Sequence, residues 1–270
     1  MKVAFQGERG AYSEAAAIEY FKNTIEPIPC MSFDDVFSHT ESGITDFGIV
    51  PIENSLAGSI HRNYDLLLRH NLNIVGEKIF RVRHCLIANP GVALADIRFV
   101  TSHPQALAQC ENFIKRIGSK IEPAYDTAGS VKLLAESGRR DTAAIASEYA
   151  ATVYKMSILT EDIEDDETNF TRFLILSKEP KQTDSPSKTS VVFSLQNIPG
   201  ALYQALSFFS LKNIDLTKIE SRPIPGSKFE YSFYLDFVGN ISDPQISEAI
   251  RNLKKIATSI RILGSYTQDV

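Results

Sequence analysis

The 270-residue sequence contains few cysteines, and none has the spacing of a metal or redox site. The three cysteines, Cys30, Cys85 and Cys110, are odd in number and form no CxxC motif. This argues against a disulfide framework and against a structural zinc site, and it is typical of a reducing compartment. The five histidines form no HExxH motif and no pair four residues apart. The sequence therefore predicts no metal centre.

Long apolar runs and concentrated positive charge are also absent from the sequence. No stretch approaches the roughly 18 apolar residues of a membrane span, and the N-terminal MKVAFQGERGAY has no apolar run of signal-peptide length. The net charge is −5, and basic pairs such as Arg139-Arg140 are isolated, which argues against nucleic-acid binding. We therefore predict a cytoplasmic protein that binds neither a membrane nor nucleic acid.

One polar segment divides the chain into two regions. Residues 177–190, SKEPKQTDSPSKTS, contain two prolines, four serines and no apolar residue, a composition typical of a linker. The chain length and the 43% hydrophobic content suit about two domains. We predict a first domain at 1–180, a linker at 181–188 and a second domain at 189–270.

Short apolar strands alternate with helical segments in the first domain, which predicts an α/β fold with mainly parallel sheets. A faint repeat with an offset of 95 residues runs through this region. It pairs Phe5 with Val100, Ser32 with Thr127, Val36 with Val131, Asp46 with Asp141 and Glu53 with Glu148. Either these matches arise by chance, or the domain consists of two similar lobes with a ligand cleft between them.

The second domain shows a different order of elements. Strands are expected at 188–195, 214–224, 229–239 and 259–266, and helices at 199–213 and 243–257. Pro199 and Gly200 stand at the start of the first helix, and Asp243 caps the second. The order βαββαβ is that of a ferredoxin-like domain.

Polar side chains follow several predicted strands of the first domain, where ligands bind in open α/β sheets. The alternative is ordinary helix capping, which we favour for Ser13 and Ser102. The loop GERGAY offers backbone N–H groups to an anion, but it lacks the spacing of a dinucleotide-binding or P-loop motif. The candidate ligand-binding residues after strands are Glu53, Asn54, Ser55, Ser102, Gln105 and Thr127.

The segment NFTRFLIL, residues 169–176, is an apolar strand that begins with three strong hydrogen-bonding groups. These are Asn169, Thr171 and Arg172. On a strand, Thr171 and Phe173 share one face and Arg172 lies on the other. An arginine beside a threonine hydroxyl in a cleft suits an anionic substrate with a polar leaving group.

These segments together resemble the prephenate dehydratase family over essentially the whole chain. GERGAYSEAA, GIVPIENSLAGS, SHPQAL, TAGS and NFTRFLIL follow in the family's order, and Thr-Arg-Phe is its best-known catalytic motif. IPGAL and ESRP resemble the two phenylalanine-binding motifs of the family's regulatory ACT domain. Tyr203 departs from the family's pattern after GAL, which affects the fine shape of the regulatory pocket. No chorismate mutase segment is recognisable, so the resemblance implies the monofunctional form.

The resemblance implies a two-lobed fold like that of type II periplasmic binding proteins. Lobe one would comprise about 1–79 and 161–180, lobe two about 80–160, and an ACT domain would follow. It implies conversion of prephenate to phenylpyruvate, water and carbon dioxide in phenylalanine biosynthesis, with no metal or organic cofactor. L-phenylalanine bound to the ACT domain would inhibit the enzyme. Because ACT domains pair side by side, we expect a homo-oligomer, either a dimer or a homotetramer.

The resemblance also assigns roles to residues of this chain. Thr171 would donate to the departing hydroxyl group, as a hydrogen-bond donor or a proton relay, because a free threonine hydroxyl is a very weak acid. Substrate would be bound by Glu53, Asn54, Ser55, Ser102, Gln105, Thr127, Asn169, Arg172 and Phe173. L-phenylalanine would be bound by Asn197, Gly200, Ala201, Leu202, Glu220 and Ser221.

Three alternative interpretations share parts of this pattern. A solute-binding protein would have the two lobes but would normally carry a signal peptide and lack the C-terminal domain. An ACT-containing amino-acid sensor would have no need of Thr171. An arogenate dehydratase performs the same elimination on the aminated substrate, and the sequence alone does not separate it from a prephenate dehydratase.

Overall fold

The computed structural model describes residues 1–22, 24–181, 187–224, 226–228 and 230–269. Its contacts divide the chain into two compact units, one of Met1–His70 and Lys78–Leu174 and the other of Asn71–Glu77 and Ile175–Val270. Most of the predicted linker, residues 182–186, lies outside the described residues, so the predicted domain boundaries stay predictions. No helix in the described part of the chain is long and apolar enough to cross a membrane.

The first sheet has the strand order β2-β1-β3-β11-β5, with β4 paired to β3. Strand β1 is parallel to both β2 and β3, and its residues Val3, Ala4 and Phe5 are completely buried. The strands are β1 (Lys2–Gln6), β2 (Glu26–Cys30), β3 (Phe47–Asn54), β4 (Gly58–Ser59), β5 (Asn73–Arg81) and β11 (Phe170–Ser177). The helices that accompany this sheet are α1 (Tyr12–Tyr20), α2 (Phe33–Ser42) and α3 (His61–Arg69). We call this sheet with its helices lobe one.

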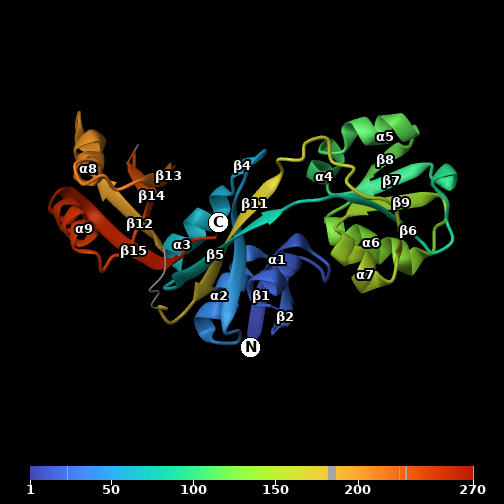
Figure 1. Cartoon of the computed structure of the whole chain (residues 1–270), viewed down its shortest axis with the longest axis horizontal. Helices are drawn as coiled ribbons and strands as arrows, with labels where there is room; N and C mark the ends of the chain where they lie inside the picture. The colour runs from blue at the N-terminus through green and yellow to red at the C-terminus, as the bar shows by residue number, and fades with distance from the viewer. Residues whose placement is uncertain (23, 182–186, 225, 229, 270) are drawn as a thin grey trace. The chain divides into compact units, whose positions relative to one another are not determined.

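The second sheet, of order β10-β6-β9-β7-β8, is formed entirely by residues between 85 and 160. Figure 1 shows it between helices α4 and α5 on one face and α6 and α7 on the other. Its strands are β6 (Cys85–Ala88), β7 (Phe99–Ser102), β8 (Lys120–Pro123), β9 (Thr142–Ala146) and β10 (Ser157–Thr160). Its helices are η1 (Leu94–Asp96), α4 (Pro104–Ala108), α5 (Glu111–Ile117), α6 (Thr127–Ser137) and α7 (Glu148–Tyr154). We call this sheet with its helices lobe two.

The two lobes repeat one arrangement. The triplet β2-β1-β3 of lobe one corresponds to β8-β7-β9 of lobe two, and in each triplet the central strand is parallel to both neighbours. Helix α2 precedes β3 just as α6 precedes β9. The 95-residue repeat is therefore structural, and the interpretation that it arises by chance is wrong. Not every pairing is parallel, because β6 is antiparallel to β9 and to β10.

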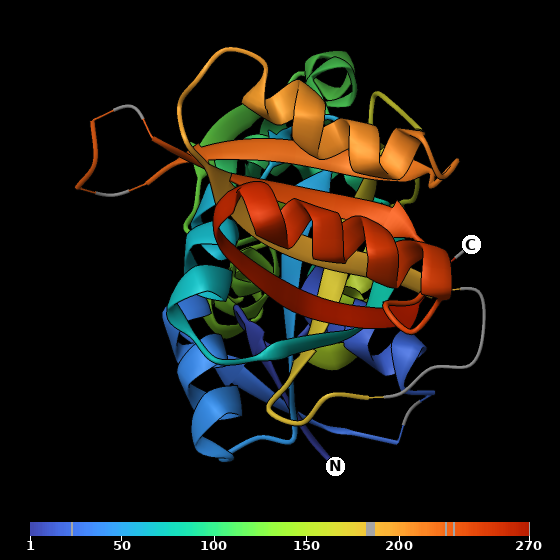
Figure 2. The same ribbon diagram turned by 90° about the vertical axis from the view of Figure 1, so that its left-hand side faces the viewer.

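The C-terminal part of the chain forms an antiparallel sheet of order β13-β14-β12-β15. Figure 2 shows helices α8 and α9 side by side on one face of this sheet. Phe193, Phe209 and Phe237 are buried in the shared core. The elements are β12 (Ser187–Leu195), α8 (Ala201–Ser210), β13 (Leu216–Pro223), β14 (Tyr231–Val238), α9 (Pro244–Ile256) and β15 (Ala257–Thr267). This confirms the predicted fold class, two α/β lobes followed by a ferredoxin-like βαββαβ domain.

A buried ion pair joins the start of β12 to β5 within the second unit. The Nζ atom of Lys188 donates to both carboxylate oxygens of Glu77 at 2.7 and 3.0 Å. The two side chains are 7% and 0% exposed, respectively. Nearby, Gly264 of β15 lies so close to the backbone of Ile74 that an added Cβ atom would be 2.1 Å from its carbonyl oxygen. The sheet of the C-terminal part is therefore closely packed against residues 71–77.

Candidate active site

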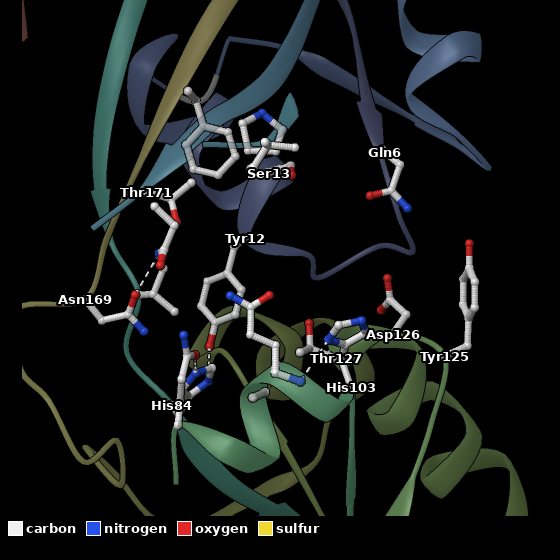
Figure 3. Close-up of a pocket in the computed structure, with 18 residues that line it drawn as sticks. Gln6, Tyr12, Ser13, His84, His103, Tyr125, Asp126, Thr127, Asn169 and Thr171 are labelled. Carbon is white, nitrogen blue, oxygen red and sulfur yellow. Dashed lines mark hydrogen bonds between the residues drawn. The ribbon is translucent and has the colours of Figure 1, made fainter. Parts of the chain in front are cut away.

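A pocket of about 390 Å³ lies within the first unit and is lined by both lobes. Its volume is within the range typical of small-molecule sites. Figure 3 shows Thr171 and Asn169 on one side of the pocket and Asp126, Thr127 and His103 on another. The lining is formed by Gln6, Tyr12, Ser13, Pro51, Asn54, Ile60, Val82, His84, His103, Gln105, Ala106, Gln109, Tyr125, Asp126, Thr127, Asn169, Thr171 and Phe173.

The amide of Asn54, at the end of β3, is held in one orientation. Its Oδ1 atom accepts hydrogen bonds from the backbone N–H groups of Leu56 at 3.1 Å and Ala57 at 2.9 Å. The two donors identify this atom as the oxygen, so the Nδ2 atom points the other way. The turn after β3 thereby directs an N–H donor towards the start of β11.

The Nδ2 atom of Asn54 donates to the Oγ1 atom of Thr171 at 3.0 Å and to Oδ1 of Asn169 at 2.8 Å. It also lies 3.1 Å from the carbonyl oxygen of Phe170. Because the Thr171 oxygen accepts this bond, the hydroxyl hydrogen is left to donate in another direction. In the described residues it has no acceptor, and the side chain of Thr171 faces the pocket. The arrangement leaves Thr171 as a donor directed at whatever the pocket binds.

Asn169 adds a second donor to the same wall of the pocket. Its side chain is fully buried, and its Oδ1 atom is satisfied by Asn54. Its Nδ2 atom has no hydrogen-bond partner among the described residues. An unsatisfied buried donor is costly, so such groups usually have a partner in the functional state. A ligand in the pocket would supply it.

His84 lines the pocket and contacts residues of both lobes. Its Nδ1 atom lies 2.8 Å from the hydroxyl of Tyr12, and its Nε2 atom lies 2.9 Å from Oε1 of Gln109. Its backbone N–H donates to Oε2 of Glu164 at 2.9 Å. Burial lowers the pKa of His84 below its ordinary value, despite the opposing hydrogen bond of Gln109 and charge of Glu164. His84 is therefore neutral at neutral pH and acts as a hydrogen-bonding group.

Sequence reasoning missed several residues of the lining. His84 and Gln6 stand just after or at the end of a strand, and Tyr12 lies within the motif GERGAYSEAA, but none of them was singled out; no motif contains Gln109. Asp126 could have been found, because it immediately precedes the predicted Thr127 in YDTAGS.

Two capping predictions are wrong. Helix α4 is capped by His103, whose Nδ1 atom accepts from the backbone N–H of Gln105 at 3.2 Å. Ser102 is the last residue of β7, and its hydroxyl donates to the carbonyl oxygen of Ile145 at 2.6 Å. Helix α1 is capped by Ala11, so Ser13 lies inside the first turn. In both helices the cap is therefore a different residue from the predicted one. Because Ser13 does not cap α1, its side chain can line the pocket.

The glycine loop before α1 is already occupied by a carboxylate of the protein itself. The fully buried Glu14 accepts from the N–H of Gly10 and from Nε of Arg9, both at 2.7 Å. The hydroxyl of Tyr149, in lobe two, donates to the same carboxylate at 3.1 Å. The N–H group of Gly10 therefore donates to Glu14 and is not available to a ligand. The bond from Tyr149 to the same carboxylate links lobe one to α7.

The structure brings most, but not all, of the predicted substrate-site residues together. Arg172 is half-buried and outside the lining, because its position on β11 alternates with those of Thr171 and Phe173. Ser55 donates to the carbonyl of Thr168 at 2.6 Å. Glu53 and the buried Ser102 are also outside the lining. The predicted residues that line the pocket are Asn54, Gln105, Thr127, Asn169, Thr171 and Phe173.

A smaller pocket, of about 100 Å³, lies at the start of α8 in the second unit. It contains Asn197, Ala201 and Leu202 of the predicted regulatory residues, whereas Gly200 caps α8 beside it. Glu220 and Ser221 lie on β13, an edge strand of the sheet, and outside this lining. The other lining residues are Leu195, Gln196, Ile198, Tyr231 and Phe233.

Two family models match this chain, and each covers one of the two pockets. The family model described as prephenate dehydratase matches residues 3–181, and the ACT domain model matches residues 189–255. The chain belongs to the prephenate dehydratase family. The pocket that contains Thr171 thus lies within the part matched by prephenate dehydratase, and the smaller pocket lies within the ACT domain.

Relatives of the family are similar along the whole chain. Arogenate dehydratase/prephenate dehydratase 2 of Arabidopsis thaliana, named chloroplastic, is 51% identical over 280 residues, covering 100% of this chain and 73% of the relative. A prephenate dehydratase from Arthrobacter aurescens, solved in complex with L-Phe, has a TM-score of 0.91 and 31% identity over 99% of this chain and 90% of its own. A structure described as GqqA, a novel type of quorum quenching acylase, has a TM-score of 0.93 and 34% identity over 100% and 98%.

Proposed function

We propose that this protein converts prephenate to phenylpyruvate, water and carbon dioxide, a step of phenylalanine biosynthesis. The observation that carries the proposal is the donor pair at the start of β11. Asn54 donates to Thr171 Oγ1, so the Thr171 hydroxyl hydrogen is directed to another acceptor, and the buried Nδ2 atom of Asn169 is unsatisfied beside it. A departing hydroxyl group needs such donors.

The reaction makes an aromatic ring from a cyclohexadienol. The bond from the ring to its carboxylate breaks, and its electron pair forms the new ring double bond. The C–O bond at the opposite ring carbon breaks, and the hydroxide takes up a proton to leave as water. Donors at that oxygen stabilise the negative charge that develops on it. We assign this role to Thr171, whose proton, when transferred, is replaced from solvent.

The apolar part of the pocket favours loss of the ring carboxylate. Phe173 is almost fully buried and lines the pocket together with Val82 and Ile60. A carboxylate against such a wall loses hydration, which raises the energy of the charged ground state relative to a transition state in which the charge is dispersed.

The polar groups of lobe two would hold the side-chain carboxylate of the substrate. Gln105 is in the first turn of α4, and Thr127 is the first residue of α6. Four further residues, which lie outside the lining, would support the lining residues or reach the substrate when the lobes close. These are Glu53, Ser55, Ser102 and Arg172. Arg172 remains our proposed partner of a substrate carboxylate, since a guanidinium group binds carboxylates in a bidentate manner.

One assay tests the proposed reaction. Purified protein is incubated with prephenate, and phenylpyruvate is measured against a sample without enzyme, because prephenate also decomposes spontaneously. We expect turnover that is saturable in prephenate. A rate equal to that of the sample without enzyme would overturn the proposal.

We further propose that L-phenylalanine binds the ACT domain and inhibits the reaction. The backbone N–H groups at the start of α8 have no acceptor within the helix and suit a carboxylate, although that of Ala201 donates to the carbonyl of Ile198 at 3.2 Å. A pocket lined by both apolar and polar side chains lies beside them. The structural relative from Arthrobacter aurescens, 31% identical, was solved with L-Phe. Inhibition arises if the ligand binds a less active state more tightly, a coupling of typically about 1–3 kcal/mol.

Titration of L-phenylalanine against turnover tests this regulation. We expect inhibition in the wild type and none in Gly200→Val, because Gly200 has a φ of +84° and caps α8. A circular dichroism spectrum like that of the wild type verifies that the variant is folded. Inhibition that is absent at millimolar phenylalanine in the wild type would show that the ACT domain only serves assembly.

The oligomeric state and the compartment are also proposals. Among the described residues, strand β13 pairs on one side only, with β14, so its outer edge can pair with a second chain. We propose a dimer through the ACT domains and a homotetramer built from two dimers. The three cysteines are free and buried, which suits a reducing compartment, and we propose the cytoplasm. Sedimentation at several protein concentrations measures the oligomeric state.

A further inference from the structure

One carboxylate lines the catalytic pocket, and among the residues that form this lining there is no lysine or arginine. The carboxylate belongs to Asp126, directly before helix α6 of lobe two. Figure 3 shows Asp126 and Gln6 on opposite sides of the same space. For a pocket that binds a dicarboxylate, an acidic lining residue without a neighbouring cation in the lining requires an explanation.

The two oxygens of Asp126 have different surroundings. Its Oδ1 atom accepts a hydrogen bond from the backbone N–H of Gly129 at 2.6 Å and thereby caps α6. Its Oδ2 atom has no hydrogen-bond or ion-pair partner in the described part of the chain. This oxygen faces Gly7 of lobe one, where an added Cβ atom would be 3.1 Å away. A glycine at that position leaves Oδ2 accessible.

Donors for a carboxylate lie directly beside this acceptor. Thr127 and Ala128 are the first residues of α6, so their backbone N–H groups have no acceptor within the helix. The helix dipole makes this end positive, and the hydroxyl of Thr127 adds a further donor. A carboxylate would bind these donors, and an ammonium group on the adjacent carbon would then lie near Oδ2 of Asp126.

Prephenate and arogenate differ at this carbon only. The side chain of arogenate carries an ammonium group beside its carboxylate, whereas that of prephenate carries a ketone. An ammonium group donates to a carboxylate in a strong, charge-assisted hydrogen bond. A ketone oxygen has only lone pairs and cannot donate to Asp126, which as a carboxylate has no proton to offer.

We propose that Asp126 recognises the amino group of the substrate and makes the pocket favour arogenate over prephenate. This rests on the elimination proposed above, because both substrates lose the same groups from the ring. Arogenate would give phenylalanine directly, whereas prephenate gives phenylpyruvate. Asp126 contacts a part of the substrate that does not react, so it contributes to binding rather than to the chemical step.

The substitution Asp126→Asn tests this assignment. Asparagine caps a helix about as well as aspartate, so α6 should keep its start while the negative charge is lost. We expect kcat/KM for arogenate to exceed that for prephenate in the wild type, and the ratio of the two to fall about tenfold or more in the variant, as is typical for a lost charged hydrogen bond. The loss should lie in KM for arogenate, because uniform binding is removed.

Asp96→Asn is the matched control. Asp96 is exposed in lobe two and accepts from the backbone N–H of Ala93 at 2.9 Å, outside the pocket. The same change of charge there should leave the substrate ratio unchanged. If Asp126→Asn does not fold, as judged by thermal unfolding, Asp126→Ser replaces it, since serine also caps helices but is too short to reach an ammonium group.

The outcomes separate this inference from the proposed function. A folded Asp126 variant with the wild-type ratio overturns the role of Asp126. A wild type that turns over prephenate but not arogenate also overturns it, while the proposed function stands. A wild type that turns over neither substrate overturns the proposed function itself.

Discussion

Asn54 and Thr171 lie 117 positions apart in the chain, yet the Nδ2 atom of Asn54 donates to Thr171 Oγ1 at 3.0 Å. The bond joins the end of β3 to the start of β11, two neighbouring strands of lobe one. The direction of this hydrogen bond determines which of the two side chains still has a hydrogen to donate to a substrate. Since Asn54 is the donor, Thr171 keeps its own hydrogen for the ligand.

Thr171→Ala should abolish most turnover and keep the fold. The change removes the donor, and loss of one well-placed donor typically costs a factor of about a hundred or more in rate. Thr171→Ser, which keeps a hydroxyl group, should retain much more activity. Steady-state kinetics with thermal unfolding as a fold check measure both. Near wild-type turnover in the alanine variant would contradict the catalytic assignment.

Asn54→Asp should lower both stability and rate. The new carboxylate keeps the oxygen that accepts from Leu56 and Ala57 but cannot donate to Thr171 or Asn169. The acceptors that lose their donor should cost about 1–3 kcal/mol in the free energy of unfolding, measured by urea denaturation. The Thr171 hydroxyl would also lose the donor that orients it. We therefore expect kcat to fall even under conditions in which the variant is fully folded.

Asn89→Asp is the control for the Asn54 variant. Asn89 also donates through Nδ2 to two backbone carbonyls, those of Leu134 at 3.1 Å and Arg139 at 2.8 Å, but it lies outside the pocket. We expect it to lose stability without a matching loss of kcat. An equal loss of kcat in both variants would show that Asn54 acts only through stability.

His84 should make the protein less stable as the pH falls. Burial lowers the pKa of His84 in the folded state, whereas the unfolded chain has the ordinary value of about 6.5. Above about pH 6.5 both states are neutral, and the group contributes no pH dependence. As the pH falls from there towards the lowered folded pKa, only the unfolded state binds the proton, so stability is lost.

Melting temperatures of the wild type and His84→Gln between pH 5 and 8 measure this contribution. The wild type should lose more stability than His84→Gln on going from pH 7 to pH 5. The same substitution at the exposed His61 serves as a control. Parallel pH profiles for wild type and His84→Gln would contradict the assigned pKa direction.

Lys188→Met should strongly destabilise the second unit. The change removes the Lys188 ammonium from the fully buried carboxylate of Glu77, and breaking a buried ion pair by removing one partner typically costs about 3–5 kcal/mol. The double variant Glu77→Leu/Lys188→Met removes both charges and should recover most of the loss. Lys115→Met breaks the exposed pair with Glu111 and should change little. If Lys188→Met and Lys115→Met lowered the free energy of unfolding in urea equally, burial would not explain the contribution of the Lys188–Glu77 pair.

Much of the fold could be predicted from the sequence, because it depends on local pattern. The alternation of apolar strands with helices, the repeat of 95 residues and the βαββαβ order all arise from periodicities of neighbouring residues. The parity of a strand likewise placed Thr171 and Phe173 on one face and Arg172 on the other, and the pocket lining follows this parity.

The sequence by itself thus determined which segments form strands and helices, and which of them end in polar groups. Only the tertiary structure decided the partner of each group. The hydroxyl of Ser102 donates to a carbonyl 43 positions away instead of capping α4, and the carboxylate of Glu14 fills the loop beside Gly10. His84, Tyr12 and Gln109 meet although no motif connects them. A hydrogen bond depends on distances of a few ångströms between atoms, and the packing of distant segments, not local pattern, determines those distances.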